Sequence, residues 1–206
     1  MRRFQNYQPK GVIPATLLAF NEDFAINERE TRRHLAHVAA NRGLSAITVN
    51  GHASEVHACS FAEQQRILEL ALDEVGDRLP LINGVYASGS IEAARIAQMA
   101  DRTGASCLLV FPPDSMSMGG QLRPEMALAH FKRIADATDL PMILFQYPMA
   151  SGLVLQPGFA RCSACGGGGA VPCRAGATPS TGLKSWRRLL GGLPRSLGAR
   201  SRVDAP

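Results

Sequence analysis

The sequence predicts an α/β fold made of about five βα units in series. Short apolar segments bounded by turn-forming residues alternate with amphipathic helical segments, and successive strand-like segments lie roughly 26–35 residues apart. Such strict alternation is typical of a parallel sheet covered by helices. Two architectures fit: an open doubly wound sheet, and the first part of an eight-stranded (β/α)8 TIM barrel. No GxGxxG motif follows the first strand-like segment, which argues against dinucleotide binding.

The strand-like segments are apolar runs flanked by glycine, proline or polar turn residues. The best defined is Met142 to Phe145, which is expected to be a buried strand. Pro148 cannot donate to a sheet ladder, so this strand should end near Tyr147. Its carboxyl end then lies where parallel α/β folds place their chemistry. The other four segments are residues 11–20, 46–50, 79–85 and 106–111.

Capping residues mark the starts of the helices between these strands. Asn27 and Ser60 each lie three positions before a glutamate, which can return the capping hydrogen bond. Ser90 is expected to cap the third helix. Pro124 suits the first turn of the fourth, which is expected to end near Thr138.

The charge of the chain is unevenly divided, although its formal net charge is +5. Residues 1–157 carry a net charge of −2, and residues 158–206 carry +7. The basic excess belongs to the last quarter, so no nucleic-acid-binding face is expected on the folded part. No apolar run is long enough for a membrane span, and the N-terminus lacks the apolar core of a secretory signal. We therefore expect a cytoplasmic protein without membrane contact.

The chain is expected to divide into a partial barrel domain, residues 1–157, and a low-complexity, disordered tail, residues 158–206. Gly, Ala, Arg, Ser and Pro dominate the tail, which contains four consecutive glycines and no strand-like segment. This composition buries too little apolar surface to offset the entropy of ordering. Five strands cannot close a barrel, so the fifth strand should remain an open apolar edge.

The loop after the second strand is the first candidate site. Gly51 followed by small residues allows backbone N–H groups to approach an anion at the end of the strand. A tight βα turn, in which Ser54 or Glu55 bonds only backbone, explains the same residues. Both interpretations stay open at this point.

No metal site is expected. His34 and His37 are three residues apart on a predicted helix, without a third ligand in view. The cysteine pattern of the tail has no matching second pair, which makes it a weak zinc signal. Cys59 and Cys107 lie in or near apolar segments and are expected to be reduced and buried.

Several motifs follow one another along the chain: Gly-Val-Ile-Pro-Ala-Thr at 11–16, Gly51-x-x-x-Glu55, Phe-Pro-Pro at 111–113, and Leu-Phe-Gln-Tyr-Pro at 144–148 with a following Ser-Gly. In this order and spacing they resemble the dihydrodipicolinate synthase/N-acetylneuraminate lyase family, over about residues 8–157. The resemblance implies a (β/α)8 barrel, usually assembled as a homo-tetramer. It also implies class I aldolase chemistry, in which a lysine on the sixth strand forms a Schiff base with pyruvate or another 2-keto acid. No cofactor is expected.

In this family the loop after the second strand holds the keto-acid carboxylate, so the resemblance assigns substrate binding to Gly51, Ala53, Ser54 and Glu55. Gly51 and Glu55 match the family loop, but His52, Ala53 and Ser54 replace its usual Thr/Ser-Thr-Gly. We expect His52 to take part in catalysis.

The family's proton-relay tyrosine on the fifth strand is replaced by Phe145. Tyr147 lies two residues further on, and residues i and i+2 of a strand share a face. We therefore expect Tyr147 to supply the catalytic phenol. Asp114 stands where the synthases often have a tyrosine. These changes fit an unassigned member of the superfamily better than dihydrodipicolinate synthase itself.

The sixth-strand lysine is missing from its expected place. The region roughly 25–30 residues beyond Phe145 has no lysine, and Lys184 follows about ten residues late without strand-like flanks. We therefore expect a C-terminally truncated or frame-shifted member, inactive as this chain. The alternative is a non-catalytic α/β module that binds a small carboxylate, or a nonfunctional remnant.

Overall fold

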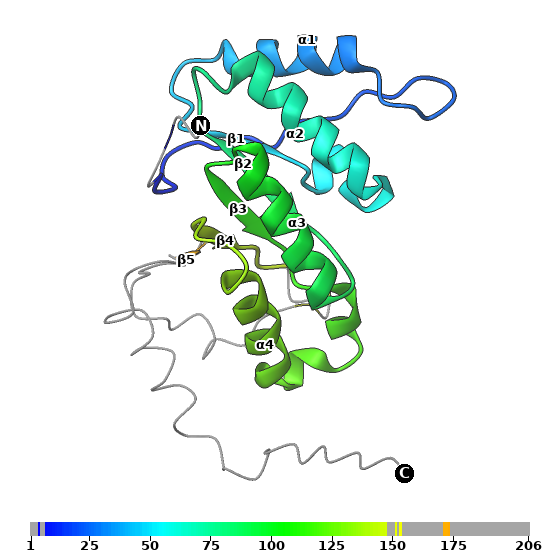
Figure 1. Cartoon of the computed structure of the whole chain (residues 1–206), viewed down its shortest axis with the longest axis vertical. Helices are drawn as coiled ribbons and strands as arrows, with labels where there is room; N and C mark the ends of the chain where they lie inside the picture. Colours follow the sequence, from blue (N-terminus) through cyan, green and yellow to red (C-terminus); the bar gives the residue numbers. More distant parts are fainter. Residues whose placement is uncertain (1–3, 5–6, 148–150, 152, 154–170, 174–206) are drawn as a thin grey trace, which may run out of the picture. The chain divides into compact units, whose positions relative to one another are not determined.

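The computed structural model describes Phe4, residues 7–147, Ser151, Leu153 and residues 171–173 (Figure 1). The chain divides into two compact units, residues 1–176 and 177–206. The second unit lies outside the described residues, as does most of the tail predicted to be disordered. The predicted domain boundary after residue 157 falls inside the first unit and stays a prediction.

Four strands pair in parallel in the order in which they follow along the chain. They are β1 (Ile47–Val49), β2 (Leu81–Val85), β3 (Cys107–Val110) and β4 (Met142–Leu144), and the main helices are α1 (Glu28–Ala39), α2 (Phe61–Val75), α3 (Ser90–Thr103) and α4 (Pro124–Ala135). The predicted alternation of strands and helices is confirmed. A doubly wound sheet reverses its strand order at a switch point. The described strands show no such reversal, which favours the barrel.

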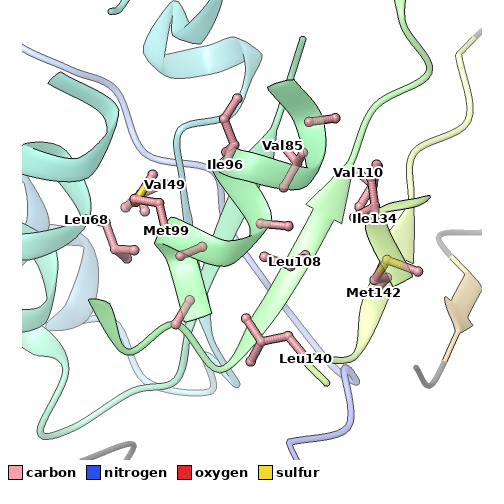
Figure 2. Close-up of a cluster of buried hydrophobic side chains, with 14 of the residues drawn as sticks. Val49, Leu68, Val85, Ile96, Met99, Leu108, Val110, Ile134, Leu140 and Met142 are labelled. Carbon is pink, nitrogen blue, oxygen red and sulfur yellow. The ribbon is translucent and has the colours of Figure 1, made fainter. Parts of the chain in front are cut away.

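The helices cover one face of this sheet. Side chains from all four belong to one buried apolar cluster. It includes Leu68, Ile96 and Ile134 from the helices and Leu108 and Met142 from the strands (Figure 2). The opposite face carries a separate, smaller cluster: Ala46, Ile82, Cys107 and Ile143, with Tyr7, Ile13 and Leu109 packed against it. One helix-covered face and one inner face are the arrangement of a barrel wall.

The first predicted strand, residues 11–20, is not a regular strand. It runs parallel to β1 but pairs only through isolated bridges, Val12 with Leu44 and Ala15 with Thr48. Pro14 has no N–H and cannot complete the ladder, although its carbonyl oxygen accepts from Thr48 at 2.9 Å. The segment therefore lies where a first barrel strand belongs, with a weaker ladder than predicted.

A fifth strand, β5 (Val171–Cys173), pairs antiparallel with β4. Two predictions are wrong here: the tail does contain a strand, and the edge of β4 is covered over three residues. The composition of the tail limits how much apolar side-chain surface it can bury, whereas edge pairing needs only backbone N–H and C=O groups.

The predicted helix starts are partly confirmed. Asn27 caps α1 by accepting from the Glu30 N–H at 3.0 Å, but the Glu30 carboxylate pairs with Arg33 at 2.6 Å instead of returning the bond. Ser60 and Glu63 form the complete reciprocal box at the start of α2.

The start of α3 differs from the prediction, whereas the start of α4 agrees with it. Ser90 does not cap α3: the capping position is Gly89, and the Ser90 hydroxyl bonds His130 Nδ1 at 3.0 Å. Pro124 opens α4 as predicted, but this helix ends before Thr138.

Cys59 and Cys107 are free and buried, as predicted. Among the described residues, none of the helices has the length and apolar character needed to cross a membrane.

His130 couples the stability of the fold to pH. Its side chain is buried between α3 and α4, and burial lowers its pKa from 6.5 to about 4. The unfolded chain therefore binds a proton more readily than the folded one below pH 6.5. We predict a loss of up to about 3 kcal/mol in the free energy of unfolding between pH 6.5 and 4.

Urea denaturation at a series of pH values would measure this loss. His130→Gln should flatten the acid limb, whereas His37→Gln, at an exposed position on α1, should keep it. An acid limb unchanged in His130→Gln would contradict the assignment.

Candidate functional site

The carboxyl ends of the four parallel strands bring their loops to one edge of the sheet, here called the carboxyl edge. His52 follows β1, Tyr86 follows β2, Phe111 follows β3, and Phe145 and Tyr147 follow β4. Parallel pairing dictates this meeting, because every strand of such a sheet ends on the same side. The rings of these residues contact one another at the carboxyl edge.

His52 lies at the centre of this group. Its Nε2 and the Tyr147 hydroxyl are hydrogen-bonded to each other. The centroid of its ring lies 4.2 Å from that of Phe111, 5.5 Å from that of Tyr86 and 5.9 Å from that of Phe145. The structure thus brings together the two residues assigned to catalysis from the sequence, although their catalytic role stays a prediction.

The protonation of His52 is biased toward the neutral imidazole. Burial lowers its pKa below the ordinary 6.5, and His57 lowers it further by charge repulsion, while Asp114 acts in the opposite direction. At neutral pH the ring therefore carries one proton and one free nitrogen lone pair. Such a ring can accept a proton at one nitrogen while it donates one from the other.

Tyr147 is a neutral phenol at neutral pH. Burial raises its pKa to about 12, and the negative charge of Asp114 adds to the effect. Phe145 packs against it, with ring centroids 5.0 Å apart. The two rings thus lie side by side, although both residues follow the end of β4. That Tyr147 supplies the hydroxyl that Phe145 lacks stays a prediction.

A second hydrogen bond at the carboxyl edge joins the Tyr86 hydroxyl to Asp114 Oδ2. This bond is the main cause that raises the pKa of Tyr86 to about 12. Tyr86 was not predicted from the sequence. Its position directly after a predicted strand could have identified Tyr86 as a candidate, because the functional residues of parallel α/β folds lie at the carboxyl ends of the strands.

The loop that carries His52 folds as a compact turn. The carbonyl oxygen of Gly51 accepts from both the N–H and the hydroxyl of Ser54, at 3.1 and 2.9 Å. Ser54 is buried, whereas Ala53 and Glu55 are exposed. The Ser54 hydroxyl therefore bonds backbone, as expected if the loop is a tight βα turn. Substrate binding by Gly51, Ala53, Ser54 and Glu55 stays a prediction.

A close approach of two backbones fixes where this loop begins. Asn50 has a left-handed backbone, with φ of 54°. A Cβ added to Gly84 of β2 would overlap the carbonyl oxygen of Asn50. Only glycine leaves room at this position for the chain to turn out of β1 toward His52.

Among the described residues, no group of three or more His, Cys, Asp and Glu side chains is arranged to hold a metal ion. A groove of about 350 Å³ lies between α2 and α3. It is lined by Phe61, Gln65, Arg95, Gln98, Met99, Arg102 and Thr103. None of the candidate residues predicted from the sequence lines this groove.

The sequence model of the Dihydrodipicolinate synthetase family matches residues 8–162. The chain belongs to this family. Among curated members, the 4-hydroxy-tetrahydrodipicolinate synthase of Methanopyrus kandleri is 30% identical over 152 residues, which are 73% of this chain and 49% of that protein. The synthase of Acidothermus cellulolyticus is 32% identical over 148 residues, or 71% of this chain and 46% of that protein.

Solved structures of the family share the fold. YagE, a prophage protein of E. coli K12 determined in complex with pyruvate, has a TM-score of 0.65 at 23% identity, covering 73% of this chain and 49% of YagE. The 4-hydroxy-tetrahydrodipicolinate synthase of Methylacidiphilum fumariolicum SolV has a TM-score of 0.64 at 22% identity, covering 74% and 49%. The fold is therefore a partial (β/α)8 barrel, and the chain spans about half the length of the relatives it matches.

The close approach at Gly84 gives a sharp prediction. Gly84→Ser should lower the free energy of unfolding by about 3 kcal/mol or more, because the new Cβ displaces the backbone at Asn50. Gly89→Ser is the matched control. A Cβ there meets no atom within 4 Å, and serine suits the capping position, so its effect should stay within about 0.5 kcal/mol. Equal stability of the two variants in urea denaturation would refute the constraint.

Proposed function

We propose that the carboxyl edge is the keto-acid-binding half of a class I, Schiff-base aldolase-type lyase site, and that its ligand is a small 2-keto acid such as pyruvate. The observation that carries this proposal is the hydrogen bond between His52 and Tyr147, which joins the loops after β1 and β4. Membership in the Dihydrodipicolinate synthetase family and the pyruvate complex of YagE support the ligand class.

The turn after β1 offers backbone donors for the ligand's carboxylate. The N–H groups of Ser54, Glu55 and Val56 bond carbonyl oxygens inside the turn. The N–H groups at the start of a helical turn have no partner within it. In this proposal the N–H groups of His52 and Ala53 bind the carboxylate, and Ser54 holds the turn in shape through its bond to Gly51.

Tyr147 and His52 are the proton-transfer pair in this proposal. The raised pKa of Tyr147 keeps its hydroxyl protonated, and the lowered pKa of His52 keeps a lone pair available at neutral pH. A phenol bonded to a neutral imidazole can pass a proton to a ligand atom and recover one from the ring. The Phe111 and Phe145 rings pack against His52 and limit its access to water.

The amine of the Schiff base does not come from the described residues. Imine formation needs an unprotonated lysine close to the keto carbon. Lys10 precedes the first bridge to β1 and lies at the opposite end of the sheet, where its carbonyl oxygen accepts from the Ser45 hydroxyl. The Lys132 ammonium pairs with Asp136 at 2.5 Å on the helical layer. Neither lysine reaches the carboxyl edge, and Lys184, outside the described residues, follows the expected place by about ten residues. We therefore infer that this chain binds the keto acid without forming the imine.

Two measurements on the same sample test this function. Titration with pyruvate, followed by NMR of labelled His and Tyr rings, should shift the His52 and Tyr147 signals to saturation. Treatment with borohydride in the presence of pyruvate should leave the intact mass unchanged, because only an imine is captured covalently. Acetate, which lacks the keto group, is the control ligand.

The outcomes separate the possibilities. A covalent adduct at Lys10, Lys132 or Lys184 would show that the chain supplies its own nucleophile. Ring signals that stay unchanged with saturating pyruvate would contradict keto-acid binding at the carboxyl edge.

A further inference from the structure

The last residue before the His52 loop, Asn50, has an unusual environment. It stands at the end of β1 with a left-handed backbone, and its side chain is fully buried. Its amide nitrogen Nδ2 donates two hydrogen bonds of 2.8 Å, one to Asn83 Oδ1 on β2 and one to the carbonyl oxygen of Gln64 on α2. One side chain thus joins β1 to the next strand and to the following helix.

This arrangement carries a local cost. The amide oxygen Oδ1 of Asn50 and Oε1 of Gln64 are buried without a hydrogen-bond partner among the described residues. An unpaired buried polar atom costs about 1–3 kcal/mol. An apolar side chain at position 50 would remove the unpaired Oδ1, but it would also leave the buried Asn83 Oδ1 without the donor that Asn50 supplies. Departures of this kind from local packing rules are expected at functional sites.

The direction of the chain after Asn50 depends on the same contacts. Gly84, next to Asn83 on β2, leaves the space that the Asn50 carbonyl group occupies. Asn83 is itself fully buried, and its amide nitrogen donates to the Gly84 carbonyl oxygen at 2.7 Å. Two residues after Asn50 the chain presents His52 to Tyr147. A shift at Asn50 would therefore move His52 relative to β4.

We propose that Asn50, held by Asn83 and by the first turns of α2, is a positioning residue that sets how His52 faces Tyr147 and the ligand. The proposal rests on the proposed function in one respect, the contact of His52 with a ligand. Asn50 touches no reacting atom. It acts through the backbone of the turn and fixes the imidazole in the aromatic environment of the carboxyl edge.

The test follows the ionisation of His52, which a merely structural role of Asn50 would not change. The titratable groups that face His52 are His57, Asp114, Tyr86 and Tyr147, and all four are kept in every variant below. Since burial holds the pKa of His52 low, release of the turn should raise it toward 6.5. NMR titration of the His52 ring in the full chain, without ligand, measures this shift.

Three variants and one control decide between positioning and general stability. Asn50→Ala and Asn83→Ala should each raise the pKa of His52 by about half a unit or more. Asn50→Gly keeps the left-handed backbone accessible but removes both side-chain bonds, so it should raise the pKa as well. Thr138→Ala removes a partly buried hydrogen bond of 2.6 Å to Asp101 elsewhere in the fold and should leave the His52 titration unchanged.

Each outcome bears on the proposal. A wild-type titration in Asn50→Gly would mean that backbone conformation alone suffices, and would overturn the role of the amide bonds. An equal shift in Thr138→Ala would reduce the effect to general loosening and would also overturn it. Pyruvate titration of the same samples separates the two proposals: a pKa shift in the variants with no pyruvate binding in wild type would sustain positioning and reject the proposed function.

Discussion

The parallel pairing of β1 to β4 decides where every side chain of the candidate site lies. Each strand is only three to five residues long. Even so, the four strands pair in parallel and in chain order, so all of them end at the same edge of the sheet. The first residues beyond that edge come from segments up to about a hundred positions apart, yet His52 and Tyr147 share a hydrogen bond. Gly84 completes the constraint, because a side chain there would occupy the space of the Asn50 carbonyl group.

Periodicity and capping signals predicted most of the fold. The alternation of apolar strands with amphipathic helices gave the parallel order, and Ser60 with Glu63 marked the start of α2 correctly. The errors arose where tertiary contacts outweigh local preference. The Ser90 hydroxyl bonds His130 rather than capping its own helix. β5 pairs with β4 through backbone groups, which composition does not reveal.

The candidate site was also predictable only in part, because some of its contacts depend on tertiary structure. The two-residue period of a strand predicted that Tyr147 lies on the same side of the chain as Phe145, and their rings are in contact. The position of His52 directly after β1 predicted that His52 lies at the same edge of the sheet. The Tyr86–Asp114 bond and the buried amides of Asn50 and Asn83 were not predicted. They depend on how neighbouring strands align, and no spacing within a single segment encodes that alignment. The structure thus places the Tyr147 phenol and the His52 imidazole beside Phe145, just beyond the end of β4.

A double-mutant cycle between His52 and Tyr147 tests the central claim most directly. The free energy of unfolding would be measured for the wild type, His52→Phe, Tyr147→Phe and the double variant. Phenylalanine keeps the ring packing at both positions and removes only the hydrogen-bonding groups. A direct bond between the loops after β1 and β4 predicts a coupling energy of about 1 kcal/mol. Single-variant effects that add without coupling would contradict the contact on which this account of the site is built.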